Sequence, residues 1–234
     1  MAVTVQSVLD RVQQTLQDTG GIRWSSTAEL ILWVNDAQRE IALLKPDATA
    51  TNTTVTLAAG TKQTIPAGGN RLLNVVRNMS AASSGTGKRT VRLVSRDILD
   101  SLEPSWHDPA VKGDAKHGTS VKHFMYEDQD PRNFYVYPGV SGNAYLEIIY
   151  SENPATVAAN ANLGVPDIYA TAVMHYVLYM CYMKDTEFVA NQQRAGSHFN
   201  LFMSSVTGKS QIDMVTSPNA NATPQAQPQL SGVG

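Results

Sequence analysis

The chain is poor in cysteine, in charged side chains and in long hydrophobic runs. Cys181 is the single cysteine among 234 residues, which excludes an intrachain disulfide framework and is typical of a protein assembled in a reducing cytoplasm. Charged residues make up 16% of the chain, against about 25% in an average globular protein. So little charge is typical of a surface that other proteins cover.

Lys and Arg form no long run, although 18 of them stand against 20 Asp and Glu and give a net charge of −2. A strong phosphate-binding surface needs clustered cations, so sequence-specific binding of nucleic acid is not expected. Passive contact with nucleic acid in a wide channel is compatible with this charge pattern.

No segment predicts membrane insertion or export. The most apolar stretch, residues 168–183, is shorter than the roughly 20 residues that a membrane-spanning helix needs. The opening residues, MAVTVQSVLDRVQQ, have no basic segment followed by an apolar run, so they do not predict a signal peptide.

The sequence predicts no catalytic residue and no cofactor. Residues 85–90, GTGKRT, approach a phosphate-binding loop, but Ala82 stands where its first glycine belongs and Arg89 where a Ser or Thr should hold the metal. Cys181 and His175 are six residues apart on one expected helix, so they do not share a face. The G-x-S-x-G sequence of hydrolases is absent.

Residue types that bind metal ions gather between positions 103 and 123. They are His107, Asp108, Asp114, His117 and His123. No pair of them has the short fixed spacing that makes a metal motif specific. We expect a polar loop in which Trp106 is packed, and no metal site, and we keep a metal-dependent hydrolase as an alternative.

Helical periodicity marks the first 50 residues. Two sets of apolar residues recur at three- and four-residue spacing: Val5, Val8, Leu9, Val12 and Leu16, and then Leu30, Val34, Ala37, Ile41 and Leu44. Gly20-Gly21 is expected to end the first helix. Ser26–Glu29 is typical of a capping box that begins the second, which Pro46 ends.

The same periodicity returns at the other end. Pro166 suits a first helical turn, and a second stripe begins at Phe188 and is expected to end at Gly208. Between the helix pairs, residues 51–152 alternate in polarity. Short strands are expected near 55–57, 72–76 and 91–93, with a helix at 95–102. Three more strands, at 123–126, 134–137 and 144–150, have turn-rich connections and predict an antiparallel meander.

The sequence therefore predicts an α+β fold. The N- and C-terminal helix pairs would form a helical bundle with a central antiparallel β-rich insertion, a meander or a sandwich. We assign residues 1–50 to the first hairpin, 51–152 to the β-rich domain, 153–212 to the second helix pair and 213–234 to an extended arm.

The arm is expected from composition. Residues 214–234 contain no charged side chain, and a tail of Pro, Ala, Asn, Gln and Ser buries too little apolar surface to order by itself. Such a segment suits an arm that becomes ordered along another subunit. Its candidate contact residues are Met214, Val215, Pro218, Pro224, Pro228 and Leu230.

Aromatic residues dominate the C-terminal helices, and tyrosines are enriched at protein interfaces. Most of these side chains are expected to fill the core, and some to face a neighbouring subunit. The candidates for such an interface are Trp33, Tyr169, Tyr176, Tyr179, Phe199 and Phe202.

The chain resembles the head-to-tail adaptor proteins of tailed bacteriophages, also called connector or head-completion proteins, and is similar to the tail tubular A proteins. The resemblance rests on residues 27–48, TAELILWVNDAQREIALLKPDA, and on the segments 60–66 and 166–212. Its most specific part is the phrase from Trp33 to Ile41, followed closely by Pro46.

This resemblance implies a structural virion protein and no enzyme. It implies a homo-oligomeric ring, typically a dodecamer, beneath the phage portal protein, with the C-terminal arm on the portal and a tail or nozzle protein below. Genome DNA would pass the lumen without specific binding. The protein would be assembled in the host cytoplasm and reside at the portal vertex of the virion. The alternative is a minor virion or baseplate protein whose β domain binds a carbohydrate or a receptor.

Overall fold

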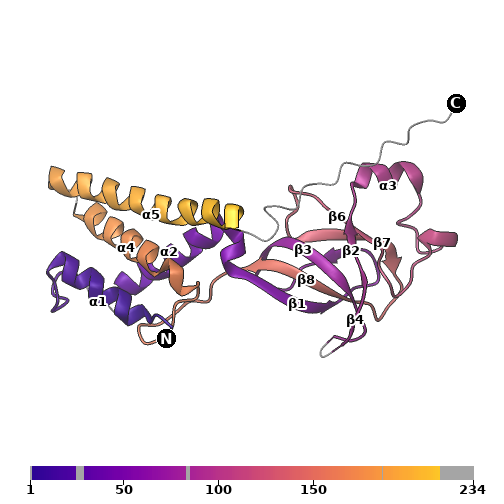
Figure 1. Cartoon of the computed structure of the whole chain (residues 1–234), viewed down its shortest axis with the longest axis horizontal. Helices are drawn as coiled ribbons and strands as arrows, with labels where there is room; N and C mark the ends of the chain where they lie inside the picture. The colour runs from indigo at the N-terminus through magenta and orange to yellow at the C-terminus, as the bar shows by residue number, and fades with distance from the viewer. Residues whose placement is uncertain (1, 25–28, 83–84, 186, 217–234) are drawn as a thin grey trace.

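Helices gather at one end of the molecule and strands at the other in the computed structural model (Figure 1). The structure describes residues 2–24, 29–82, 85–185 and 187–216. The expected α+β class is confirmed. Four long helices flank the β-rich part in sequence, and α3 (Arg96–Leu102) lies within it. The four are α1 (Val5–Leu16), α2 (Ile31–Leu44), α4 (Ala170–Lys184) and α5 (Val189–Thr216).

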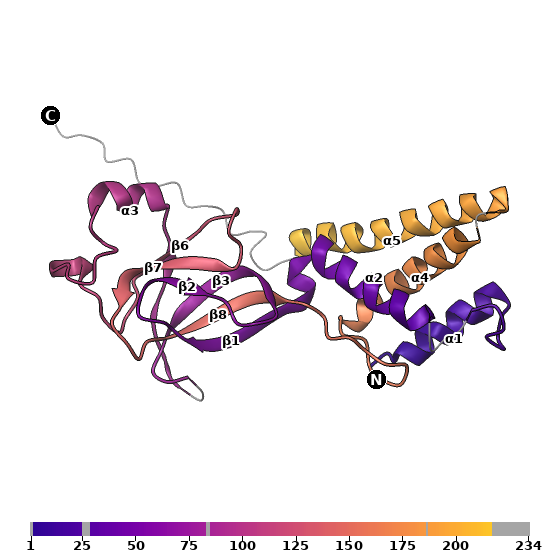
Figure 2. The same ribbon diagram turned by 180° about the vertical axis from the view of Figure 1, so that it is seen from behind.

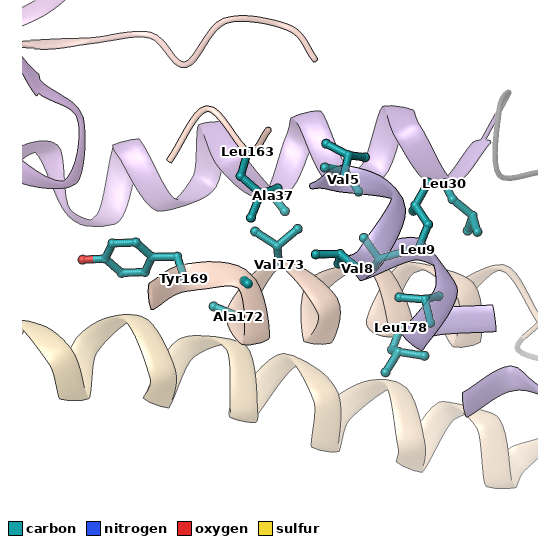
Figure 3. Close-up of a cluster of buried hydrophobic side chains, with 14 of the residues drawn as sticks. Val5, Val8, Leu9, Leu30, Ala37, Leu163, Tyr169, Ala172, Val173 and Leu178 are labelled. Atoms are coloured by element: carbon teal, nitrogen blue, oxygen red, sulfur yellow. The ribbon is translucent and has the colours of Figure 1, made fainter. Parts of the chain in front are cut away.

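Helix α4 packs against α1, α2 and α5, and their buried side chains form one hydrophobic cluster. Side chains from α1, α2 and α4 point toward one another in Figure 3. The predicted face of α1 is confirmed, because Val5, Val8, Leu9 and Val12 are all at most 1% exposed. Burying one such side chain contributes about 1.5–3 kcal/mol. On α2, in contrast, Leu44 is 40% exposed.

Helix α1 ends earlier than Gly20-Gly21, so that prediction was wrong. Gln17 closes the helix in the left-handed conformation, with φ of 57°. The next residue turns the chain, because the Asp18 carboxylate accepts backbone N–H groups from Ile22, Arg23 and Trp24 at 2.8–3.0 Å. Of the capping box expected at Ser26–Glu29, residues 26–28 lie outside the described part of the chain.

Two buried amides of α2 hold the segment that leads from the strands back to the helices. Asn35 Oδ1 accepts the N–H of Val157 at 2.8 Å, and Asn35 Nδ2 donates to the carbonyl of Val157 at 3.2 Å. Gln38 Oε1 accepts the N–H of Gly164 at 2.5 Å. These amides thus fix the course of residues 157–164 over α2.

The β-rich part consists of two four-stranded sheets (Figures 1 and 2). Their strand orders are β1-β8-β3-β4 and β2-β7-β6-β5. All paired strands are antiparallel except β5 and β6, which are parallel. Side chains of both sheets share one buried cluster. The strands are β1 (Ala50–Thr56), β2 (Gly60–Thr64), β3 (Gly69–Met79), β4 (Gly87–Thr90), β5 (Arg92–Leu93), β6 (His123–Tyr126), β7 (Asn133–Val140) and β8 (Tyr145–Glu152).

The last three strands do not form the expected meander. Strands β6 and β7 pair as predicted, but β8 lies in the other sheet, between β1 and β3. Its inward residues Leu146 and Ile148 are fully buried, because they face the opposite sheet across the shared core. The chain crosses between sheets at Gly142 and Asn143, which have φ of 143° and 45°.

Helix α5 continues through Gly208 to Thr216, so the predicted end at Gly208 was wrong. Asp213, Met214 and Val215, assigned to the arm, therefore lie in its last turns. None of the helices in the described ranges is long and apolar enough to cross a bilayer.

Candidate subunit and partner surfaces

Three aromatic side chains reach the surface where α4 and α5 lie side by side. Tyr176 and Tyr179 of α4 are half-buried, and Phe199 of α5 is 39% exposed. The rings of Tyr179 and Phe199 lie 5.1 Å apart, and those of Tyr176 and Tyr179 lie 5.9 Å apart. We call these three residues the aromatic face. Paired aromatic rings of this kind are typical of interface cores.

The other expected interface residues lie elsewhere. Tyr169 and Phe202 are each 1% exposed. Both are therefore buried in the core of the single subunit and offer no surface to a neighbour. Trp33 is half-buried and lies 6.1 Å from the ring of Trp24, beside the described end of the α1–α2 connection. Of the six candidate interface residues, the aromatic face and Trp33 therefore keep surface for another subunit.

The aromatic face borders an acidic part of α2. Burial raises the pKa of Tyr176, and the carboxylates of Glu40 and Asp36 raise it further. The phenol therefore stays protonated at neutral pH and can donate a hydrogen bond. Asp36 forms an exposed ion pair with Arg39 at 2.9 Å, an arrangement typical of an interface rim.

The C-terminal end of α5 is anchored to the end of α2. Lys45 is 5% exposed and forms ion pairs with Asp213 and, at 3.8 Å, with Asp47. Burial lowers the pKa of Lys45, but hydrogen bonds to Asp213 and Tyr169 outweigh it and raise the pKa above its ordinary value. Lys209 lies over the Tyr169 ring, 4.8 Å from its centre. Sequence patterns missed this anchor, because its partners are 168 positions apart.

The anchor fixes the last turns of α5, which precede most of the expected arm in the sequence. Val215 is 78% exposed on the last turn of α5, and Met214 precedes it in the same helix. The remaining candidate arm residues, Pro218, Pro224, Pro228 and Leu230, lie outside the described residues.

The residues that the sequence offered as candidates for catalysis or metal binding make structural contacts. His107 stacks on Trp106 at 3.7 Å, and the fully buried Trp106 donates its indole N–H to Asp100 at 2.8 Å. Among the described residues no three His, Cys, Asp or Glu side chains are placed to hold a metal ion. Burial raises the pKa of the Cys181 thiol to about 12, which keeps it protonated and unreactive. Residues 87–90 of the loop-like GTGKRT sequence form β4.

A histidine pair joins α4 to α5. The Nδ1 atoms of His175 and His198 are 3.1 Å apart. Tyr182 stacks on His198 at 5.6 Å, and Arg194 lies 5.8 Å from the centre of the Tyr182 ring. Burial lowers the pKa of both imidazoles, and the proximity of His175 lowers that of His198 further.

This pair makes helix packing sensitive to acid. A histidine whose pKa is lower in the folded than in the unfolded chain contributes stability at pH values above 6.5, the ordinary histidine pKa. That contribution is lost as the pH falls through the pKa of the folded state. Urea unfolding should therefore give a lower free energy of unfolding at pH 5 than at pH 7.5. His198→Phe keeps the stacking on Tyr182 and should reduce that difference; an unchanged difference would contradict the assignment.

Comparison with known proteins points to one family. The family model of the SU10 adaptor protein matches residues 3–222, which include the aromatic face, the Lys45 anchor and the first residues of the expected arm. A search of curated proteins gives no match. Because the match covers nearly the whole chain, the protein belongs to the SU10 adaptor family of phage head-to-tail adaptors.

Proposed function

We propose that this phage structural adaptor forms a homo-oligomeric ring beneath the portal protein and links the capsid vertex to the tail. The observation that carries the proposal is the family match over residues 3–222. In this proposal the four long helices act as one bundle and the β-rich residues 51–152 as a separate domain. The portal lies above the ring, a tail or nozzle protein lies below it, and the ring has twelve subunits.

The aromatic face is our candidate for the ring contact. In a closed ring each subunit presents one surface to one neighbour and a different surface to the other. Tyr179 and Phe199, half-exposed on adjacent helices, supply rigid apolar area that a neighbour can cover. Repetition of a modest contact around the ring gives strong avidity without one tight site.

The arm completes attachment to the portal. Residues 214–234 carry no charge, and they follow directly on Asp213, whose position the ion pair with Lys45 fixes. Ordering the arm only when the portal is present delays assembly until the head is ready, since the ordering entropy is offset only by the new contacts. Met214 and Val215 then form the base of this arm.

The surface of α5 suits a wall past which DNA slides. Its charged side chains with described placement are held within the subunit: Arg194 lies over Tyr182, Lys209 over Tyr169, and Asp213 pairs with Lys45. The exposed positions between them are mostly Gln, Asn, Ser and Thr. Arg194 and Lys209 are the two Lys or Arg side chains with described placement on this helix, and a surface with so few cations binds phosphates weakly, so the genome would pass without being retained.

The proposal is tested by depletion and reconstitution. Phage that lack this protein should accumulate DNA-filled heads without tails, seen by electron microscopy. Purified protein, followed by purified tail components, should restore infectious particles in vitro. Tailed infectious particles formed without the protein would refute the proposed role, and restoration by unrelated virion proteins would do so equally.

A further inference from the structure

The far end of the β-rich part has an edge that no described segment covers. Strand β5 is the edge of one sheet and β4 the edge of the other, and a single residue, Val91, joins them. Every residue of both strands is exposed, whereas Val91 is 7% exposed and anchors the junction in the core. Figures 1 and 2 show β4 at the opposite end of the molecule from the long helices. We call residues 87–93 the β4–β5 edge.

This edge concentrates positive charge in a chain whose net charge is −2. Lys88, Arg89 and Arg92 are exposed and form no ion pair with any residue of the described ranges. Their positive charge acts on the neighbouring His123. Burial lowers the pKa of His123, and the charges of Arg89, Lys122 and Arg92 lower it further. Unneutralised cations at one edge favour an anionic partner.

An apolar groove adjoins the cations. It encloses about 350 Å³ between β3 and the β5–β6 pair and is lined mainly by Leu72, Leu73, Val91, Leu93, Phe124 and Tyr126. Leu93 is 64% exposed at its mouth. The Tyr126 hydroxyl is buried and has no hydrogen-bond partner among the described residues.

A cationic and an apolar side chain follow one another along β5. Arg92 lies opposite His123, and Leu93 lies opposite Phe124 of the core cluster. Successive side chains of a strand point to opposite faces. The N–H of Arg92 donates to the carbonyl of Lys122, directly before β6, and the N–H of Val94 donates to the carbonyl of Phe124 in β6. The N–H of Leu93 therefore points to the open side. An added strand would therefore meet a cation on one face and the groove on the other.

We propose that the β4–β5 edge binds an extended segment of a partner protein in which acidic and apolar side chains alternate. The segment adds a strand beside β5, its acidic side chains facing Arg89 and Arg92 and its apolar ones entering the groove at Leu93. Main-chain hydrogen bonds supply affinity, and the alternation supplies specificity. Duplex DNA fits less well, because half of this surface is apolar and its free cations are few.

Binding of defined peptides to the full-length protein tests this inference. The probes are a fluorescein-labelled peptide of about ten alternating Glu and Val residues, the same peptide with Lys in place of Glu, and a duplex DNA of about 20 base pairs. Fluorescence anisotropy should show binding of the Glu/Val peptide that weakens with salt, and little binding of the other two probes. Arg89→Glu with Arg92→Glu should weaken the Glu/Val complex at least about tenfold.

Matched variants separate this contact from general charge effects. Arg11→Glu with Lys112→Glu changes the net charge equally at exposed positions elsewhere and should leave peptide binding unchanged. Leu93→Pro removes the outward N–H without removing a bond to β6 and should abolish binding. If Leu93→Pro lowers the melting temperature, the inference is judged only from the comparison of the two charge-reversal variants. The inference is overturned if the Glu/Val peptide shows no binding at about 1 mM, if both charge-reversal pairs act alike, or if DNA binds this edge and displaces the peptide.

Discussion

Deletion of residues 217–234 is expected to leave a folded protein that no longer joins heads to tails. The deletion keeps the whole of α5 and its anchor to Lys45, so the melting temperature should not change. It removes residues 217–234 of the uncharged arm, and with them the proposed portal contact that each subunit of the proposed ring would repeat. Because avidity multiplies these contacts, in vitro tail joining should fall by about a hundredfold or more. Counting tailed and tailless DNA-filled heads by electron microscopy measures the effect.

The position of the cut decides what such an experiment reports. A deletion that begins after Gly208 also removes Lys209 and Asp213, which contact Tyr169 and Lys45. Lys45 is 5% exposed and would keep a buried charge with the Tyr169 hydroxyl and, at 3.8 Å, the Asp47 carboxylate as its described partners. We expect that longer deletion to cost about 1–3 kcal/mol of folding free energy and to lower the melting temperature. Normal tail joining by the shorter deletion would refute the arm, whereas failure of the longer one alone would report only lost stability.

The buried face of a helix covered on one side was predictable from the sequence, and the buried positions of a helix covered on several sides were not. The valines of α1 repeat at helical spacing and are at most 1% exposed, because α1 contacts the core along a single stripe. Helix α4 is covered by α1, α2 and α5, so its apolar residues surround it and no stripe separates inner from outer positions. For that reason Tyr169, Tyr176 and Tyr179 looked equivalent, although the first is buried and the other two reach the surface.

The end of α5 shows how distant contacts override local signals. Glycine within a helix costs about 1 kcal/mol relative to alanine, which made Gly208 a reasonable stop signal. The helix continues because Lys209 and Asp213, in the turns that follow, reach Tyr169 and Lys45. The pairing of β8 has the same origin. Strand β8 belongs to its sheet because Leu146 and Ile148 pack against the opposite sheet. Its position next to β7 in the sequence does not make the two strands pair.

The phrase that carried the resemblance has a structural explanation in two of its polar residues. Asn35 and Gln38 are 4% and 0% exposed, and their amides hold residues 157 and 164. A buried amide without its partners costs about 1–3 kcal/mol, so substitution at either position would disturb the return of the chain to α4. Polar residues on the core side of a helix were the available sequence signal for this role.

Tyr179→Glu combined with Phe199→Glu is expected to convert rings into monomers. The two rings lie 5.1 Å apart across α4 and α5, and neither belongs to the buried core cluster of the helices, so the isolated subunit should keep its circular dichroism spectrum. At a covered interface the same change buries two unpaired carboxylates and removes two aromatic anchors, each of which contributes about 2 kcal/mol or more in typical interfaces. Native mass spectrometry at micromolar concentration, with the portal absent and present, distinguishes monomer from ring.

The matched control places the same two charges away from the helices. Thr119 and Ser120 are adjacent exposed residues of the β-rich part, and Thr119→Glu with Ser120→Glu should leave the oligomeric state unchanged. Because both variants gain the same charge, a difference between them isolates the aromatic face from electrostatic repulsion between subunits. If the aromatic variant assembles like the wild type, this face lies outside the ring contact. Since α4 is covered on its other sides by α1, α2 and α5, the contact would then be sought on the outer surfaces of α1, α2 or α5 or on the β-rich part.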